Sequence, residues 1–200
     1  LWSALEAEVK MLNEKREHTS KLPGVRIPEE VEITTDLKSC LDDADVAVLA
    51  VPSPFTRSTA KQMAPFVKEG QIIVNVAKGI EEKTLMTMTD IISEEIPAVG
   101  VYVLSGPSNA EEVGRGIPTT CVISGPKRET AEYLQGIFMS PVFRVYTTPD
   151  MLGVELGGAL KNVIALAAGT ADGLGYGDNT KAALITRGIA EMTRLGVKMG

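Results

Sequence analysis

The chain of 200 residues is 44% hydrophobic and 23% charged, a composition typical of a globular protein. Its net charge of −6, without a basic stripe, argues against nucleic acid or an acidic membrane surface as a partner, although local lysines can still bind a small anion. Cys40 and Cys121 lie far apart and His18 is the single histidine, so we expect no metal site and a reducing, cytoplasmic location. We also expect no signal peptide and no membrane span, because no apolar run approaches the roughly 18 residues that a span requires.

Strand and helix patterns alternate along most of the chain. Apolar spacing, caps and breakers predict helices at 4–17, 37–41, 54–67, 84–96 and 128–138, with a short one after Asn109. They predict strands at 32–35, 46–51, 71–77, 100–104, 119–124 and 143–146. This alternation implies a mainly parallel sheet with helices on both faces, and the continuous apolar run at 46–51 suits a strand buried on both faces.

From Pro149 onward the pattern is helical, with a first helix from about Met151 and a second from about Asn179. We therefore predict an α/β fold in which a mainly parallel sheet is followed by the start of an all-helical C-terminal domain. The predicted division separates residues 1–148 from residues 149–200.

The first of these two helices carries Lys161 and Asn162 in an otherwise apolar run. Helical side chains lean toward the helix N-terminus, so Lys161 covers the backbone at Gly157 and Gly158. Each glycine destabilises a helix interior by about 1 kcal/mol relative to alanine. The pair permits a ligand or another segment of backbone to approach the helix closely beside the ammonium group. Two interpretations stay open: a small anionic ligand, or tight packing on another backbone with Lys161 reaching solvent.

In a doubly wound sheet, ligands bind at the carboxyl ends of the strands. Phe55 follows the predicted strand at 46–51, and Lys78 is the first polar side chain after the strand at 71–77. The sequence S-G-P-S-N-A-E-E-V follows the strand at 100–104 and predicts a turn into a helix whose free amide groups could meet a phosphate.

Each of these features also has an ordinary structural interpretation. Phe55 suits a hydrophobic core, Lys78 a solvated loop, and S-G-P-S-N a common turn. Asp172, in the glycine-rich stretch between the two last helices, is expected only to organise a turn, with Asp178 or Asn179 as the cap of the second helix.

The chain resembles the NAD(P)-dependent glycerol-3-phosphate dehydrogenase family most clearly from Glu155 to Gly188, which reads E-L-G-G-A-L-K-N-V-I-A-L-A-A-G-T-A-D-G-L-G-Y-G-D-N-T-K-A-A-L-I-T-R-G. Earlier motifs follow in that family's order: L-W, L-P-G-V-R-I-P, T-D-L, V-P-S, A-K-G-I-E, S-G-P-S-N-A-E-E-V and F-R-V-Y. The resemblance implies a Rossmann-like dinucleotide-binding domain at 1–148, without its first strand and glycine-rich loop, and the beginning of a helical substrate domain at 149–200.

The resemblance also implies an activity and a set of site residues. Enzymes of this family reduce dihydroxyacetone phosphate to sn-glycerol 3-phosphate with NADH or NADPH in the cytoplasm and so feed glycerophospholipid synthesis. Carried over to this sequence, Lys161 is the catalytic lysine and Asn162 holds the substrate beside it. The other implied ligands are Lys78, Gly106 and Ser108 for the substrate, and Phe55, Lys78 and Ala110 for the nicotinamide cofactor. The implied partner is a small phosphorylated substrate, without nucleic acid, membrane or metal, and a homodimer is left open.

Two other interpretations stay open. Another β-hydroxyacid-type dehydrogenase would share the lysine–asparagine pair, and a catalytically incomplete binding module would bury residues 151–200 against a second copy. The family's glycine-rich pyrophosphate loop would precede Leu1, and its G-x-G-D-L and S-R-N stretches would follow Gly200. Ser3 and Ala4 stand where the family often has a basic residue for a 2′-phosphate, so the preference between NAD and NADP is open.

Overall fold

The computed structural model describes residues 1–97 and 99–200. Its strands are β1 (Glu17–His18), β2 (Leu22–Arg26), β3 (Val46–Leu49), β4 (Ile72–Asn75), β5 (Gly100–Ser105), β6 (Thr119–Ser124) and β7 (Phe143–Thr147). Its helices are α1 (Glu6–Lys15), α2 (Leu37–Asp42), the 3₁₀ helix η1 (Ser53–Phe55), α3 (Thr56–Met63), α4 (Met88–Glu95), α5 (Ala110–Gly114), α6 (Arg128–Phe138), α7 (Met151–Gly173) and α8 (Asp178–Met199). The predicted helix at 54–67 is therefore η1 followed by α3, and the one at 84–96 shortens to α4.

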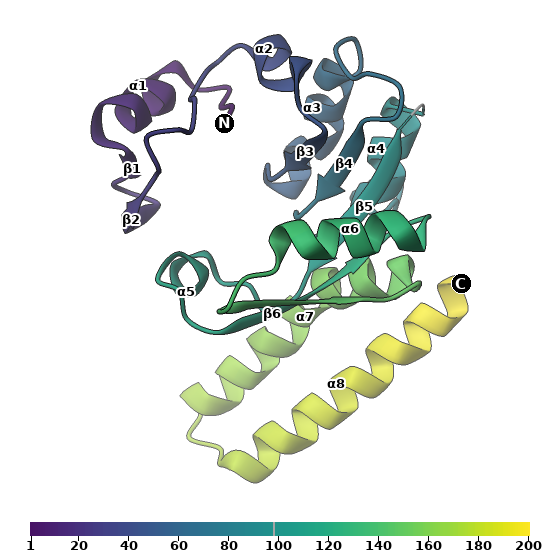
Figure 1. Cartoon of the computed structure of the whole chain (residues 1–200). Coiled ribbons are helices and arrows are strands. Elements are labelled where there is room, and N and C mark those ends of the chain that lie inside the picture. The colour runs from purple at the N-terminus through teal and green to yellow at the C-terminus, as the bar shows by residue number, and fades with distance from the viewer. Residues whose placement is uncertain (98) are drawn as a thin grey trace.

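Strands β3 to β7 form one five-stranded sheet in sequence order (Figure 1). The pairs β3/β4, β4/β5 and β6/β7 are parallel, which confirms the predicted mainly parallel sheet with flanking helices. The pair β5/β6 is antiparallel, which the sequence did not indicate. Strands β6 and β7 consequently end at the opposite edge of the sheet from β3, β4 and β5.

Side chains of the central strands alternate between two hydrophobic clusters, one on each face of the sheet. Ile73 of β4 packs with Ala60 of α3 and Ile92 of α4, whereas its neighbour Val74 packs with Leu134 of α6. All five side chains are fully buried, and burying an aliphatic side chain of this size stabilises a fold by about 1.5–3 kcal/mol. Figure 1 shows α6 lying across one face of the sheet, away from α3 and α4. The sheet therefore has a hydrophobic core on each of its faces.

Strand β3 lies at the edge of this sheet and departs from the prediction for 46–51. Ala47 and Leu49 are buried, but Val48 on the other face is 47% exposed. The expected burial on both faces is wrong for this strand, because the helices that cover the second face, α6 and α7, contact β5, β6 and β7 instead.

The N-terminal segment forms a small layer of its own from α1 and the antiparallel hairpin β1–β2 (Figure 1). The predicted break near residues 21–28 is this hairpin, and Gly24 has a φ of 82°, which a glycine adopts without steric cost. The strand predicted at 32–35 is reduced to one parallel bridge between Trp2 and Thr34. Asp36, however, caps α2 as predicted, since its side chain accepts hydrogen bonds from the amides at the start of that helix.

Glu8 is the polar centre of this N-terminal layer. Its carboxylate accepts hydrogen bonds from Lys21 Nζ at 2.7 Å and from the Ser3 hydroxyl, and His18 Nε2 lies 2.8 Å away. The hydrogen bond from Lys21, with smaller contributions from Ser3 and His18, lowers the pKa of Glu8 from 4.5 to about 2.

We expect the Glu8 carboxylate to stabilise the fold only while it is ionised. A lowered pKa in the folded state means that this contribution is complete above pH 4.5 and is lost as the pH falls from 4.5 toward 2. Glu8→Gln should therefore unfold at a lower urea concentration than the wild type at neutral pH, and the difference should shrink at acid pH. Glu14→Gln, on the exposed side of the same helix, is the matched control. A difference that stays constant with pH would contradict this role of Glu8.

The turn between α7 and α8 is organised by an ion pair. Asp172 Oδ1 lies 2.9 Å from Lys181 Nζ, which agrees with the interpretation of Asp172 as a turn residue. Helix α8 begins at Asp178 with Gly177 as its N-cap, and no side chain caps it. The predicted cap at Asp178 or Asn179 is therefore wrong, because both residues already lie inside the first helical turn.

Helix α7 corrects the expectation that no apolar run reaches the length of a membrane span. Of the described helices, it is the one long and apolar enough by length and composition, with 23 residues and a mean hydropathy of 1.4 in its most apolar window. A core helix of a globular protein passes the same test, so this is weak evidence for a span. In this structure α7 contacts β5 and β6 and pairs with α8 (Figure 1).

Candidate active site

The carboxyl ends of β3, β4 and β5 lie at one edge of the sheet, and several predicted site residues lie in the loops that leave it. Phe55 ends η1 after β3, Lys78 follows β4, and Gly106 and Ser108 follow β5. Because these three strands are parallel neighbours, the loops that follow them lie side by side.

Lys78 joins the loop after β4 to the loop after β5. Its half-buried Nζ donates a hydrogen bond to the Ser108 hydroxyl at 3.0 Å, and Ser108 donates in turn to the Gly106 carbonyl at 3.3 Å. Burial lowers the pKa of Lys78, the nearby Cys121 acts in the opposite direction, and the charge of Lys161 lowers the pKa further. Lys78 is therefore not a solvated loop lysine, and the two lysines are close enough to repel each other.

Gly106 allows the turn after β5 to pass directly over β6. A Cβ at this position would lie 2.6 Å from the carbonyl oxygen of Thr120 and 2.9 Å from Cα of Cys121. No signal in the sequence places Cys121 beside the site. Burial raises the pKa of its thiol, against a hydrogen bond from Ser108 and the charge of Lys78, so the thiol is protonated and unreactive at neutral pH.

Lys161 lies on a helix that starts at the opposite end of the strands, where β6 and β7 have their carboxyl ends. Strand β7 runs antiparallel to β5, so α7 begins at the far edge and crosses beside β5 and β6. Lys161 lies about ten residues into this helix, or about 15 Å along its axis. Its exposed Nζ donates to Asn162 Oδ1 at 2.9 Å. The length of α7 therefore delivers this pair to the carboxyl ends of the strands.

Gly158 is the point at which α7 touches the site. A Cβ on Gly158 would lie 2.8 Å from Ser105 Oγ and 3.3 Å from Lys78 Cγ, whereas a Cβ on Gly157 would meet nothing within 4 Å. Gly158 therefore permits tight packing within the protein, because its neighbours are side chains of the same chain. Gly157 leaves open surface one turn before Lys161, as a ligand would need.

We expect Gly158→Val to push α7 away from Ser105 and Lys78. Overpacking of this kind lowers the free energy of unfolding by about 1–3 kcal/mol. Gly157→Val, where space is open, is the matched control and should stay within about 0.5 kcal/mol of the wild type. Urea unfolding of both variants of the full-length protein measures the difference, and equal losses would contradict the close contact at Gly158.

The helix start after β5 departs from the predicted phosphate site. Helix α5 has five residues, and the Asn109 side chain already accepts a hydrogen bond from the Glu111 amide at 2.9 Å. Glu111 and Glu112 add two carboxylates to its first turn, which disfavours an anion there. Ala110 lies exposed at the start of α5, and Phe55 is 58% exposed, so the core interpretation of Phe55 is wrong.

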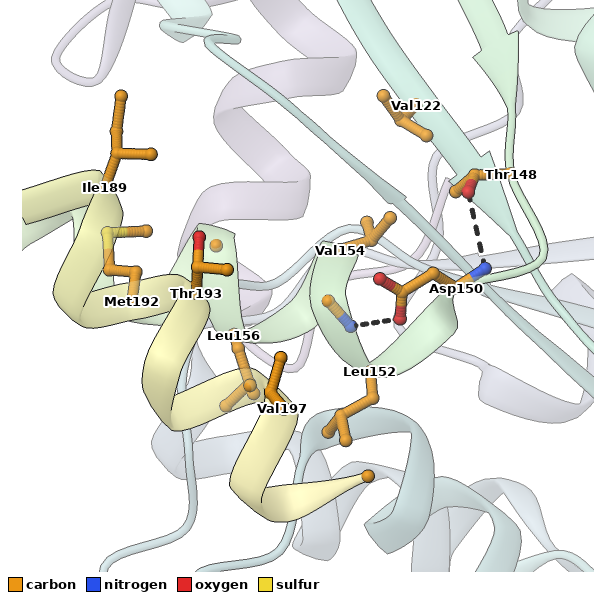
Figure 2. Close-up of a pocket in the computed structure, with 14 residues that line it drawn as sticks. Val122, Thr148, Asp150, Leu152, Val154, Leu156, Ile189, Met192, Thr193 and Val197 are labelled. Atoms are coloured by element: carbon orange, nitrogen blue, oxygen red, sulfur yellow. Dashed lines mark hydrogen bonds between the residues drawn. The ribbon is translucent and has the colours of Figure 1, made fainter. Parts of the chain in front are cut away.

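Two cavities lie along α7. The smaller, of about 300 Å³, is lined by Lys161, Gly157, Gly158 and the turn after β5. The larger, of about 680 Å³, lies between α7, α8 and the end of β6 (Figure 2). Asp150 in the larger cavity caps α7 by accepting from the Gly153 amide at 2.8 Å, and no lysine or arginine is among its described lining residues. Lys161 is the charged side chain in the described lining of the smaller cavity, and the rest of that lining is almost entirely apolar. An anion in this cavity would therefore depend on Lys161.

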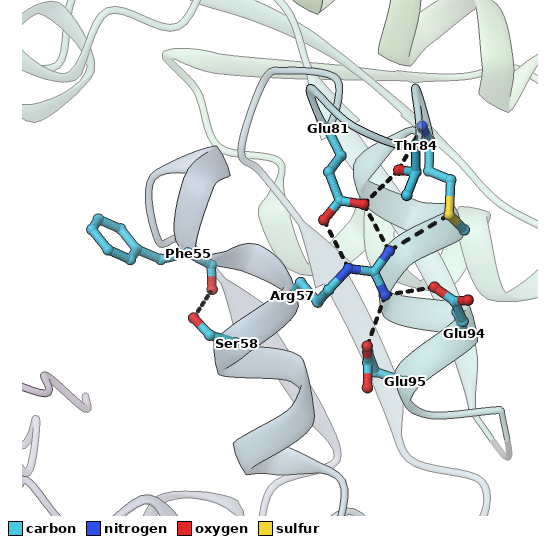
Figure 3. Close-up of polar contacts among 8 residues, drawn as sticks. Phe55, Arg57, Ser58, Glu81, Thr84, Glu94 and Glu95 are labelled. Atoms are coloured by element: carbon cyan, nitrogen blue, oxygen red, sulfur yellow. Dashed lines mark hydrogen bonds and ion pairs between the residues drawn. The ribbon is translucent and has the colours of Figure 1, made fainter.

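A cluster of ion pairs ties the Lys78 loop to α3 and α4 (Figure 3). Arg57 of α3 donates to both carboxylate oxygens of Glu81, at 2.7 and 2.8 Å. It also donates to Glu94 at 2.5 Å and to Glu95 at 2.7 Å, both on α4. The hydrogen bonds from Arg57 lower the pKa of Glu81 to about 2. No local pattern indicates this cluster, because its members come from three separate segments.

The fold and this candidate site define an α/β protein of the Rossmann type that is joined to a helical segment, with two lysines at the carboxyl ends of the strands, where proteins of this type bind ligands. Within residues 1–97 and 99–200, no group of three or more His, Cys, Asp or Glu side chains could hold a metal ion. The family model described as NAD-dependent glycerol-3-phosphate dehydrogenase N-terminus matches residues 1–131, and the corresponding C-terminus model matches residues 150–200. The chain belongs to the NAD-dependent glycerol-3-phosphate dehydrogenase family, which confirms the resemblance seen in the sequence.

Individual relatives agree with this assignment. The chain is 64% identical over 200 residues to glycerol-3-phosphate dehydrogenase (NAD(P)+) of Agathobacter rectalis and 60% identical over 202 residues to the protein of the same name of Fusobacterium nucleatum. Each match covers 100% of this chain and 60% of the relative. The crystal structure of glycerol-3-phosphate dehydrogenase from Coxiella burnetii matches with a TM-score of 0.93 at 33% identity, over 100% of this chain and 61% of that chain. The chain thus spans about three fifths of the length of the relatives it matches.

Proposed function

We propose that the protein to which this chain belongs interconverts dihydroxyacetone phosphate and sn-glycerol 3-phosphate, with NAD or NADP as cofactor. The observation that carries this proposal is the meeting of Lys78 and Lys161 at Gly158 of α7: the stem of Lys78 packs on Gly158, and Lys161 lines the same small cavity as Gly158. A doubly charged phosphate ester that carries a ketone suits such a pair, since it offers one group to bind and another to protonate. Membership of the glycerol-3-phosphate dehydrogenase family supports the same substrate.

We assign the proton transfer to Lys161. During reduction, negative charge develops on the ketone oxygen as a new C–H bond forms at its carbon, so a positioned acid has to meet that oxygen. The Lys161 ammonium gives its proton to this oxygen, and its neutral amine takes the proton back in the reverse direction. Asn162, which accepts a hydrogen bond from Lys161 Nζ, orients the ammonium group and holds the substrate beside it.

The loops after β4 and β5 bind the substrate from the other side. Lys78 supplies a positive charge, and the Ser108 hydroxyl and the backbone at Gly106 supply polar contacts. Burial of Lys78 in this turn strengthens its interaction with an anion, because fewer water molecules screen the charge.

The exposure of Phe55 and Ala110 supports their assignment to the nicotinamide cofactor, since an exposed aromatic ring offers a flat apolar contact and a small side chain leaves room beside it. We assign Phe55, Lys78 and Ala110 to the cofactor. When bound, the cofactor supplies or accepts the hydride, while the protein supplies binding and orientation.

The dinucleotide-binding domain comprises residues 1–148, and the helical substrate domain begins in residues 149–200. The protein is soluble and cytoplasmic and feeds glycerophospholipid synthesis, with a small phosphorylated substrate and without a nucleic-acid, membrane or metal partner. A homodimer fits the apolar residues that α7 and α8 leave exposed, such as Leu166 and Ile189.

The test is an assay of the full-length protein with dihydroxyacetone phosphate and either NADH or NADPH, following loss of the reduced cofactor. We expect turnover with this substrate and none with 3-oxo acids, which another β-hydroxyacid-type dehydrogenase would reduce. Turnover of the 3-oxo acids alone would replace the proposed function, and absence of turnover with all of these substrates would favour a binding module. The ratio of the rates with the two cofactors decides the cofactor preference.

A further inference from the structure

Glu155 is a buried carboxylate on the same helix as Lys161. Its side chain is 6% exposed, and it lies seven positions before Asn162, which is about two helical turns. Its two oxygens accept hydrogen bonds from the Thr89 amide at 2.9 Å and from the Thr89 hydroxyl at 2.5 Å. The two residues are 66 positions apart in the sequence, so this contact ties α7 to α4.

The contact supplies an acceptor for the Thr89 amide, which has no hydrogen-bond partner within α4. Thr87 and Asp90 form a capping box, in which the Thr87 hydroxyl accepts from the Asp90 amide and the Asp90 carboxylate accepts from the Thr87 amide. The amide of Thr89, in the first turn, is one of the donors that a helix leaves without an internal partner. Glu155 accepts this hydrogen bond from a different helix, at the end of α4 where the helix dipole favours negative charge.

The position of Lys161 depends on this helix and not on contacts of its own. The hydrogen bond of its ammonium group goes to Asn162, the next residue of α7. Helix α7 meets the rest of the site at Gly158, which packs on Ser105 and Lys78. The packing of α7 on β5, β6 and α8 is non-directional. The two hydrogen bonds from Thr89 to the Glu155 carboxylate add a directional contact, which specifies the position of the helix along and around its axis.

We propose that Glu155 is a positioning residue, which holds α7 in register on α4 so that Lys161 lies beside the Lys78 loop. Glu155 touches neither substrate nor cofactor in this assignment. Its loss lets α7 shift by a fraction of a turn, which moves Lys161 away from the substrate oxygen. The inference rests on the proposed function where it concerns turnover, and on the structure alone where it concerns the contact between α7 and α4.

The test compares three variants of the full-length protein. Glu155→Leu removes both acceptors, Thr89→Val removes the hydroxyl donor at nearly constant volume, and Glu155→Gln keeps an acceptor for the Thr89 amide. We expect Glu155→Leu to lower kcat at least tenfold, with the Kd for NADH within about threefold of the wild type. Thr89→Val should lower kcat less than Glu155→Leu does. Glu155→Gln should have a kcat within about threefold of the wild type. Glu191→Gln, on the exposed side of α8, is the control and should leave kcat unchanged.

Amide hydrogen exchange provides a readout that does not depend on turnover. Exchange in the peptides that contain Thr89 and Lys161 should accelerate at least tenfold in Glu155→Leu and stay near wild type in Glu155→Gln. If the wild type has no activity on dihydroxyacetone phosphate, the proposed function fails while the exchange result still decides the role of Glu155. Unchanged kcat and unchanged exchange in Glu155→Leu would overturn the proposal. If Glu155→Leu does not fold, kcat and exchange are compared between Thr89→Val and Glu155→Gln, and wild-type values in both variants would overturn the proposal.

Discussion

Lys161→Ala in the full-length protein is expected to lower kcat by about 10²–10⁴-fold, the usual contribution of a positioned acid or base. The substitution removes the only group that we assign to proton transfer at the substrate oxygen. It should leave the Kd for NADH nearly unchanged, because the cofactor contacts are assigned to residues outside α7. Lys161 is exposed, so its loss should not unfold the protein. Steady-state kinetics and fluorescence titration with NADH measure the two effects separately.

The control for Lys161 is Lys127→Ala, which removes an exposed lysine before α6, outside the site residues. This control should keep wild-type kinetics. Loss of NADH binding in Lys161→Ala would move the lysine into the cofactor site, and undiminished kcat would remove it from the mechanism altogether.

Lys78→Met is expected to raise the KM for dihydroxyacetone phosphate and to lower kcat/KM by about 10–100-fold. Methionine keeps most of the apolar stem that packs on Gly158 but loses the ammonium group. A hydrogen bond to a charged group is worth about 1.5–3 kcal/mol, and 1.4 kcal/mol corresponds to a tenfold change.

The same variant should gain stability at neutral pH. Burial lowers the pKa of Lys78 in the folded state, so charging this side chain costs free energy there, and stability of the wild type rises with pH between the lowered value and 10.5. Lys78→Met removes this cost and the accompanying pH dependence. Kinetics and thermal unfolding at several pH values test both effects. A variant with lower stability and unchanged kcat/KM would show that Lys78 acts as a structural residue.

Local signals were sufficient for most elements. Asp36 caps α2 as its position before a short helical pattern predicts, and the alternation of apolar strands and amphipathic helices predicts the layered fold. The stretch from Glu155 to Gly188 was sufficient to predict the family, because a long contiguous pattern carries more information than any single motif.

The sequence-based predictions were wrong where one local pattern is compatible with two structures. An apolar run such as 46–51 fits a central strand and an edge strand equally well, and only the position of β3 in the sheet left Val48 exposed. Likewise Asp178 has the chemistry of a cap, but Gly177 occupies the capping position because α8 starts one residue earlier than predicted.

The sequence by itself determined the kinds of elements, the family and the residue types of the site. The tertiary structure decided how the site is assembled: the antiparallel pairing of β5 with β6 makes α7 start at the far edge, and Gly158 lets it approach Ser105. It also decided that Glu155 is held by Thr89, although a glutamate in a helix normally faces water. The physical reason is that these contacts join residues far apart in the chain, and their free energy depends on burial and distance, which no local pattern specifies.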